Sequence, residues 1–257
     1  MRVGTANDLS VEAQGAVAVV EIHRPPNNYF DIDLIAGIAD ALDEFAGDGS
    51  TRAVVLCAEG KHFCAGAELT RRDGATNERP GHLYDHAVRM FESPLPLVAA
   101  VNGSAIGGGL GLALAADFRV ASPESRFTAN FARLGFHHGF GLTVTLPRVV
   151  GEQVAAWLLY TGERIGGERA FELGLCDRLV EADRVRDEAL AMAEEIAASA
   201  PLAVRSIRQT MRGDLAAQVR AAVERERSEQ ERLMRTDDFR EGVAATAERR
   251  PPQFAAR

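Results

Sequence analysis

The chain has 257 residues, enough for one large domain, and its hydrophobic (46%) and charged (26%) contents are ordinary for a globular protein. Its net charge of −8 comes without a basic stripe, which argues against nucleic-acid binding. The three cysteines form no CxxC or Cys/His cluster, so we expect neither a disulfide framework nor a metal site. Neither a signal peptide nor a membrane-length apolar run is present, so we expect a cytoplasmic protein without a membrane partner.

Strand-like and helix-like segments alternate in the first two-thirds of the chain. The predicted elements, in chain order, are a strand over 17–22, a helix over 34–45, a strand over 53–58, a helix over 82–91 and a strand over 97–101. The strand over 53–58 is wholly apolar, which is typical of strands buried on both faces. This alternation favours an α/β core built from repeated strand–helix units.

A glycine-rich turn follows the strand over 97–101. Gly107, Gly108 and Gly109 open an apolar helix-like run over 110–116. Glycine lets a backbone approach a ligand closely, and a helix start leaves N–H groups free to bind negative charge. A second turn of small residues, over 62–69, follows the strand over 53–58. Two such turns could direct two backbone N–H groups at one carbonyl oxygen, as in an oxyanion hole.

The last third of the chain is helical. Helices are predicted over 185–198, 202–211 and 214–234, so we divide the chain into a core, 1–182, and a helical region, 183–257. The run RERSEQER over 225–232 is charged almost throughout. We interpret it as a solvated helix face in preference to a specific partner site.

The motifs FCAGAEL (63–69) and AAVNGSAIGGGLGLALAADFRVAS (99–122) resemble the crotonase superfamily, the enoyl-CoA hydratase/isomerase family of acyl-CoA enzymes. Similarity continues through 146–180 and covers about residues 15–255. The resemblance implies a spiral core of ββα turns, followed by helices that pack in a homotrimer or hexamer. It also implies an acyl-CoA substrate, with coenzyme A as part of the thioester and no separate cofactor.

The resemblance assigns the oxyanion hole to the backbone N–H groups of Ala67 and Gly108, which would hold a thioester enolate. Hydratases of the family carry two catalytic glutamates downstream of the triple glycine. Those positions are Gly111 and Phe131 here, and neither side chain can transfer a proton. Both would instead shape an apolar acyl pocket. The resemblance thus supports thioester binding and enolate stabilisation more firmly than hydration.

Histidines of the loop over 135–141 are the candidate acid–base groups. This loop, GFHHGFG, carries His137 and His138, and histidine suits proton transfer near neutral pH. The alternative is that they lie on the surface or cap the next helix. Tyr84 and His86 lie on the helix that borders the acyl pocket in relatives. The nucleophilic aspartate of the family's dehalogenating branch would fall at Gly139, which excludes that route.

For coenzyme A, the resemblance suggests a path along Arg24, Ala65, Gly66 and Leu69, with Phe254 near the adenine. The predicted function is an acyl-CoA-processing enzyme that stabilises a thioester enolate. Two alternatives remain open: a histidine-dependent C–C bond hydrolase or decarboxylase of the same fold, and a non-catalytic acyl-CoA-binding protein.

Overall fold

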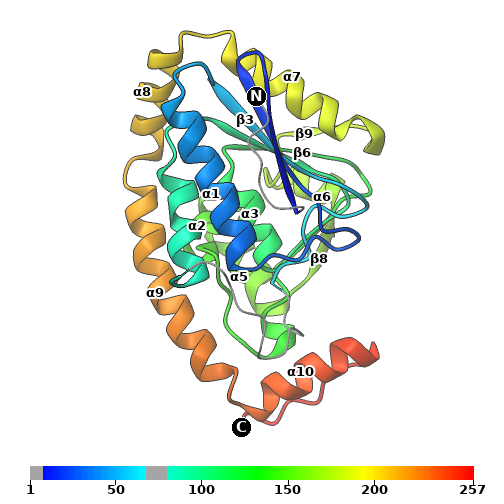
Figure 1. Ribbon diagram of the computed structural model, residues 1–257. Coiled ribbons are helices and arrows are strands. Elements are labelled where there is room, and N and C mark those ends of the chain that lie inside the picture. The colour runs from blue at the N-terminus through cyan, green and yellow to red at the C-terminus, as the bar shows by residue number, and fades with distance from the viewer. Residues whose placement is uncertain (1–7, 68–79) are drawn as a thin grey trace.

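The structure, a computed structural model, describes residues 8–67 and 80–257 (Figure 1). A six-stranded sheet has the order β1 (Leu9–Gln14), β2 (Val17–Ile22), β3 (Ala53–Ala58), β4 (Leu97–Val101), β6 (Phe118–Ala121) and β9 (Arg178–Leu179). Only its first pair, β1 with β2, is antiparallel. A three-stranded sheet has the order β5 (Ser104–Ile106), β7 (Arg126–Thr128) and β8 (Arg164–Gly166).

The helices of the first two-thirds are α1 (Ile32–Gly47), α2 (Leu83–Glu92), α3 (Gly108–Ala115), α4 (Leu142–Val150), α5 (Glu152–Thr161) and α6 (Gly167–Glu172). The last third holds α7 (Val185–Ala197), α8 (Pro201–Arg212), α9 (Leu215–Leu233) and α10 (Asp237–Glu248), and the short 3₁₀ turns are η1 (Ala132–Leu134) and η2 (Ala182–Arg184). None of the helices found in the described residues is long and apolar enough to cross a membrane.

Alternate residues of the central strands enter two separate apolar layers. Val54 and Leu56 of β3 pack with α1 and α2, whereas Val55 and Cys57 pack with α7 on the opposite face. Such strands must be apolar on both sides, which is why β2, β3 and β4 were predictable with their observed bounds. The mixed α/β fold and the helical C-terminal region are confirmed.

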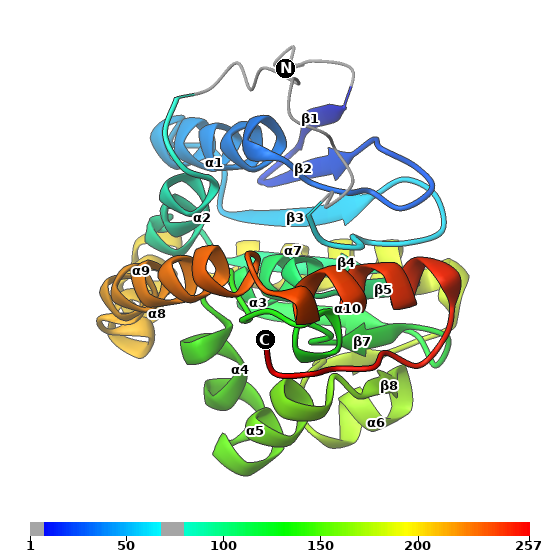
Figure 2. The ribbon, with the colours of Figure 1, turned by 90° about the horizontal axis from the view of Figure 1, so that it is seen from below.

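The C-terminal helices close around the core. Helix α7 packs on β2, β3, β4 and β6, α9 contacts α2 and α4, and α10 contacts η1. In Figure 2, α9 and α10 run across the molecule between the α1–α2 layer and the α4–α5–α6 layer. Packing therefore crosses residue 182, and the division into 1–182 and 183–257 stays a prediction.

Candidate active site

The turn after β3 forms an isolated parallel β-bridge with β5, between Cys64 and Ala105. Cys64 N donates to Ser104 O (3.0 Å), and Ile106 N donates to Cys64 O (3.0 Å). On its other side, Phe30 N donates to Gly66 O (3.0 Å). These bonds fix the backbone from Cys64 to Gly66, directly before Ala67.

The glycines at the start of α3 allow this turn to approach the helix. Gly107 has a φ of +56°, a conformation that favours glycine. A Cβ added at Gly109 would lie 2.1 Å from Cys64 O, and one at Gly66 would lie 3.4 Å from Gly108 N. Side chains at these positions would push the two turns apart. Gly108 is the first residue of α3, so its N–H has no acceptor within the helix.

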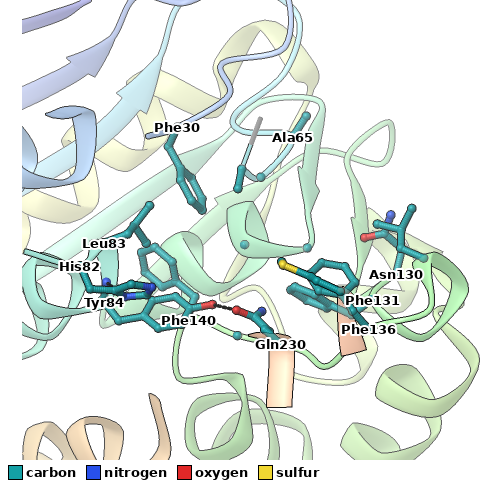
Figure 3. Close-up of a pocket in the computed structure, with 17 residues that line it drawn as sticks. Phe30, Ala65, His82, Leu83, Tyr84, Asn130, Phe131, Phe136, Phe140 and Gln230 are labelled. Carbon is teal, nitrogen blue, oxygen red and sulfur yellow. Dashed lines mark hydrogen bonds between the residues drawn. The ribbon is translucent and has the colours of Figure 1, made fainter. Parts of the chain in front are cut away.

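Ala67 and Gly108 both line a cavity of about 210 Å³ (Figure 3). Its walls are largely aromatic, with side chains of Phe30, Phe131, Phe136 and Phe140. Leu83, Leu134 and Met234 add further apolar surface. Among the described residues of this lining there is no Asp, Glu, Lys or Arg.

A hydrogen-bonded pair supplies polar atoms to the cavity. Tyr84 Oη of α2 donates to Gln230 Oε1 of α9 (2.8 Å), and Gln230 Nε2 donates to His137 O (3.0 Å). Burial raises the pKa of the Tyr84 phenol, as does the nearby Glu226 charge, so the phenol stays protonated. Gln230 was missed in the sequence; its one signal is an uncharged side chain inside a charged run.

His82 is a second lining residue that the sequence did not reveal. It caps α2, because its Nδ1 accepts from Tyr84 N (3.1 Å) while Asp85 Oδ2 accepts from His82 N (2.9 Å). Burial lowers the His82 pKa, and Arg227 lowers it further. The ring is thus a neutral imidazole with its proton on Nε2.

The structure brings neither predicted acid–base histidine to the cavity lining. His138 Nε2 bonds Thr143 Oγ1 (2.8 Å), and the His137 ring stacks on the His138 ring with centroids 4.1 Å apart. Burial lowers the His138 pKa to about 4, and the neighbouring His137 contributes. The loop therefore directs His138 toward α4. The expectation that His137 and His138 lie in the acyl pocket is corrected, because neither lines the cavity.

Glu226 explains why the loop takes this course. Its side chain is fully buried and accepts from Gly141 N (2.8 Å), Thr143 N (3.0 Å) and Thr143 Oγ1 (2.6 Å). A carboxylate at a helix start satisfies unpaired N–H groups and the helix dipole, and this one caps α4. The interpretation of 225–232 as a solvated face is therefore wrong at Glu226.

Of the remaining pocket predictions, Tyr84 and Phe131 line the cavity, and Gly111 and His86 do not. A Cβ at Gly111 would lie 2.5 Å from the Phe140 Cβ, so Phe140 covers this position and forms the wall in its place. His86 Nε2 lies 3.2 Å from Pro80 O.

The coenzyme A predictions divide in the same way. Ala65 and Gly66 line the cavity, whereas Arg24 and Phe254 do not. Arg24 pairs with Asp8 (2.9 Å) and Asp31 (2.9 Å); burial lowers its pKa, but these carboxylates outweigh burial and the net pKa is raised. Phe254 is exposed. Leu69 lies outside the described residues.

The fold and the cavity define an α/β protein with stacked strand–helix units and two glycine-dependent backbone turns at one apolar pocket. The sequence profile "Enoyl-CoA hydratase/isomerase" matches residues 12–257. The chain belongs to this family and thus to the crotonase superfamily.

Similar proteins cover nearly the whole chain. A putative enoyl-CoA hydratase of Thermus thermophilus is 35% identical over 94% of this chain and 98% of its own. A crystal structure of an enoyl-CoA hydratase/isomerase from Pseudoalteromonas atlantica has a TM-score of 0.89 at 33% identity, covering 97% of this chain and 100% of its own. A carnitinyl-CoA hydratase from Mycobacterium avium also has a TM-score of 0.89 at 33% identity, covering 98% of this chain and 100% of its own.

Proposed function

We propose that this protein binds acyl-CoA thioesters and stabilises a thioester enolate through the N–H groups of Ala67 and Gly108. The observation that carries the proposal is that Ala67 and Gly108, from separate turns, line one cavity. For neither N–H is an acceptor recorded among the described residues. Family membership supports an acyl-CoA substrate.

The enolate oxygen would accept from both N–H groups at the positive end of α3. The largely aromatic walls lower the local polarity, which strengthens these bonds. Each such donor typically contributes about 3–4 kcal/mol of transition-state stabilisation. Coenzyme A would pass along the backbone of Ala65 and Gly66, which lies on the cavity.

Hydration is not part of the proposal, because adding water across a double bond needs groups that exchange protons. The positions of the family's two glutamates are Gly111 and Phe131. The titratable side chains in the described lining, His82 and Tyr84, are both neutral.

One alternative is favoured by this lack of a base, namely decarboxylation of a thioester that carries an α-carboxylate. The bond from the α-carbon to the carboxylate breaks, its electron pair forms the enolate, and carbon dioxide leaves. A proton from water then completes the product. This decarboxylation needs the oxyanion donors but no protein base. A histidine-dependent decarboxylation is less well supported, because the histidine in the described cavity lining is the neutral His82.

Substitutions at Gly108 test the proposal. Proline is tolerated at the first position of a helix and lacks the N–H, so Gly108→Pro removes one donor. Gly108→Ala is the matched control, because it adds a Cβ against the Phe30 ring and keeps the N–H. For whichever thioester reaction the protein catalyses in the assays below, we expect kcat of Gly108→Pro to be about 10²–10³-fold lower than kcat of Gly108→Ala.

The assays measure butyryl-CoA binding by calorimetry, carbon dioxide release from methylmalonyl-CoA and hydration of crotonyl-CoA. Absence of thioester binding would overturn the proposal. Binding without turnover of either substrate would favour the non-catalytic acyl-CoA-binding alternative. Equal rates for Gly108→Pro and Gly108→Ala would remove Gly108 from the mechanism.

We further propose that the chain assembles as a homotrimer, alone or paired into hexamers. Leu202, Ile207 and Met211 on α8 support this proposal, because all three are large apolar side chains exposed on one helix.

A further inference from the structure

The Tyr84–Gln230 pair lies across the open cavity from Phe30 and Ala65, as Figure 3 shows. It joins α2 to α9, two helices far apart in the sequence that pack against each other. Neither residue belongs to the oxyanion donors, and the proposed enolate chemistry does not use them. Because both residues line the cavity, they are candidates for a separate role in substrate binding.

The hydrogen bonds of the pair leave one donor and one acceptor of Gln230 unused. Gln230 Nε2 donates one of its two hydrogens to His137 O, which fixes the amide so that Oε1 faces Tyr84. One amide hydrogen and one lone pair of Oε1 remain. A group that both donates and accepts is their match, and the smallest acyl substituent of this kind is a hydroxyl.

The rest of the described lining offers such a group few competing partners. Tyr84 is protonated, and no charged side chain is present among the described lining residues, so the pair does not favour a carboxylate or an ammonium. The phenylalanine walls favour an apolar acyl body between the thioester and the pair.

Gly139 leaves the space that the Tyr84–Gln230 pair occupies. A Cβ at this position would lie 1.9 Å from Tyr84 Oη and 2.6 Å from Gln230 Nε2. The pair thus depends on a missing side chain in the same loop whose carbonyl, at His137, orients Gln230.

We propose that the cavity selects acyl thioesters whose apolar acyl group carries a hydroxyl, which the Tyr84–Gln230 pair binds. This inference rests on the proposed acyl-CoA function. It names a substrate class and assigns Tyr84 and Gln230 the role of specificity determinants.

The test compares the binding of saturated thioesters, with and without the hydroxyl, by titration calorimetry. The probes are phenylacetyl-CoA with para-hydroxyphenylacetyl-CoA, and hexanoyl-CoA with omega-hydroxyhexanoyl-CoA. One net hydrogen bond corresponds to a preference of about tenfold, which we expect in at least one pair. In Gln230→Leu the preference falls to about onefold, and in Tyr84→Phe it decreases because Gln230 Oε1 loses a partner that orients it. In both variants, affinity for the unsubstituted thioester stays within about threefold.

Tyr160→Phe is the control, because Tyr160 is exposed on α5 outside the cavity and also loses only a hydroxyl. It should keep the full preference. Equal affinity within both probe pairs, or a preference that survives both Gln230→Leu and Tyr84→Phe, overturns the inference alone. Failure of all four thioesters to bind overturns the proposed function itself.

Discussion

Gly111 and Phe140 form a steric pair at the wall of the cavity. An added Cβ at Gly111 would lie 2.5 Å from the Cβ and 2.9 Å from the Cγ of Phe140. Phe140 also has a φ of +61°, a strained conformation for a bulky residue, and its ring packs on Phe30 with centroids 5.4 Å apart. The Phe140 side chain therefore fits in this position only because residue 111 has no side chain.

A double-mutant cycle tests this pairing. Gly111→Ala should destabilise the fold by about 1–3 kcal/mol because it overpacks the site. Phe140→Ala should cost about 3–5 kcal/mol because it leaves a cavity. The double variant should be more stable than the sum by at least about 1 kcal/mol, since alanine at 111 then has space. The free energies of unfolding come from urea denaturation.

Gly47→Ala is the control for the cycle, because a Cβ there meets no atom within 4 Å and Gly47 lies at the exposed end of α1. It should be neutral or slightly stabilising. Strict additivity of Gly111→Ala and Phe140→Ala would contradict the steric pairing.

At the scale of elements, α9 presents a charged sequence but buries selected polar groups. Glu226 caps α4, and Gln230, one turn later on the same face, lines the cavity. Helix α9 thereby connects the C-terminal region to the start of α4 and to the loop over 137–140. Its polar residues position the site, which a count of charges along the helix does not reveal.

Glu226→Ala should destabilise the protein by about 3 kcal/mol, because Gly141 N and Thr143 N lose a buried acceptor. The matched control is Glu224→Ala, which removes an exposed carboxylate from the same helix and should change stability by less than about 0.5 kcal/mol. Urea unfolding at neutral pH measures both. Equal stability of the two variants would show that the α4 cap contributes nothing.

These elements also show what the sequence could reveal. Strands β3 and β4 were predictable because burial on both faces makes them wholly apolar, and β2 is apolar except for Glu21, whereas β9 has two residues, too few for a pattern. The meeting of the two glycine turns was predictable from their small residues. The direction of His138 was not, because it depends on Glu226, 88 positions further along the chain by residue number. Gln230 was missed for the same reason, since its contact with Tyr84 spans 146 residues.

At the scale of the whole molecule, α8 exposes large apolar side chains and turns charged ones toward the core. None of its side chains is buried, and Leu202, Ile207 and Met211 are 80%, 62% and 72% exposed. Its arginines instead turn inward: Arg208 Nε bonds Asp117 Oδ2 (2.8 Å), next to the start of β6. Apolar side chains facing outward while charged ones face the core suggest a surface that another subunit covers.

If the homotrimer forms through α8, a charge on its outward face should dissociate it. The double variant Ile207→Asp and Met211→Asp buries carboxylates in the interface and should shift the mass measured by light scattering from about three chains to one. Ser228→Asp, which adds a charge at an exposed position of α9, should keep the wild-type mass. A monomeric wild type would rule out the trimer, and an unchanged mass for the double variant would place the interface elsewhere. If the double variant is monomeric, its thioester binding shows whether the cavity is complete within one chain.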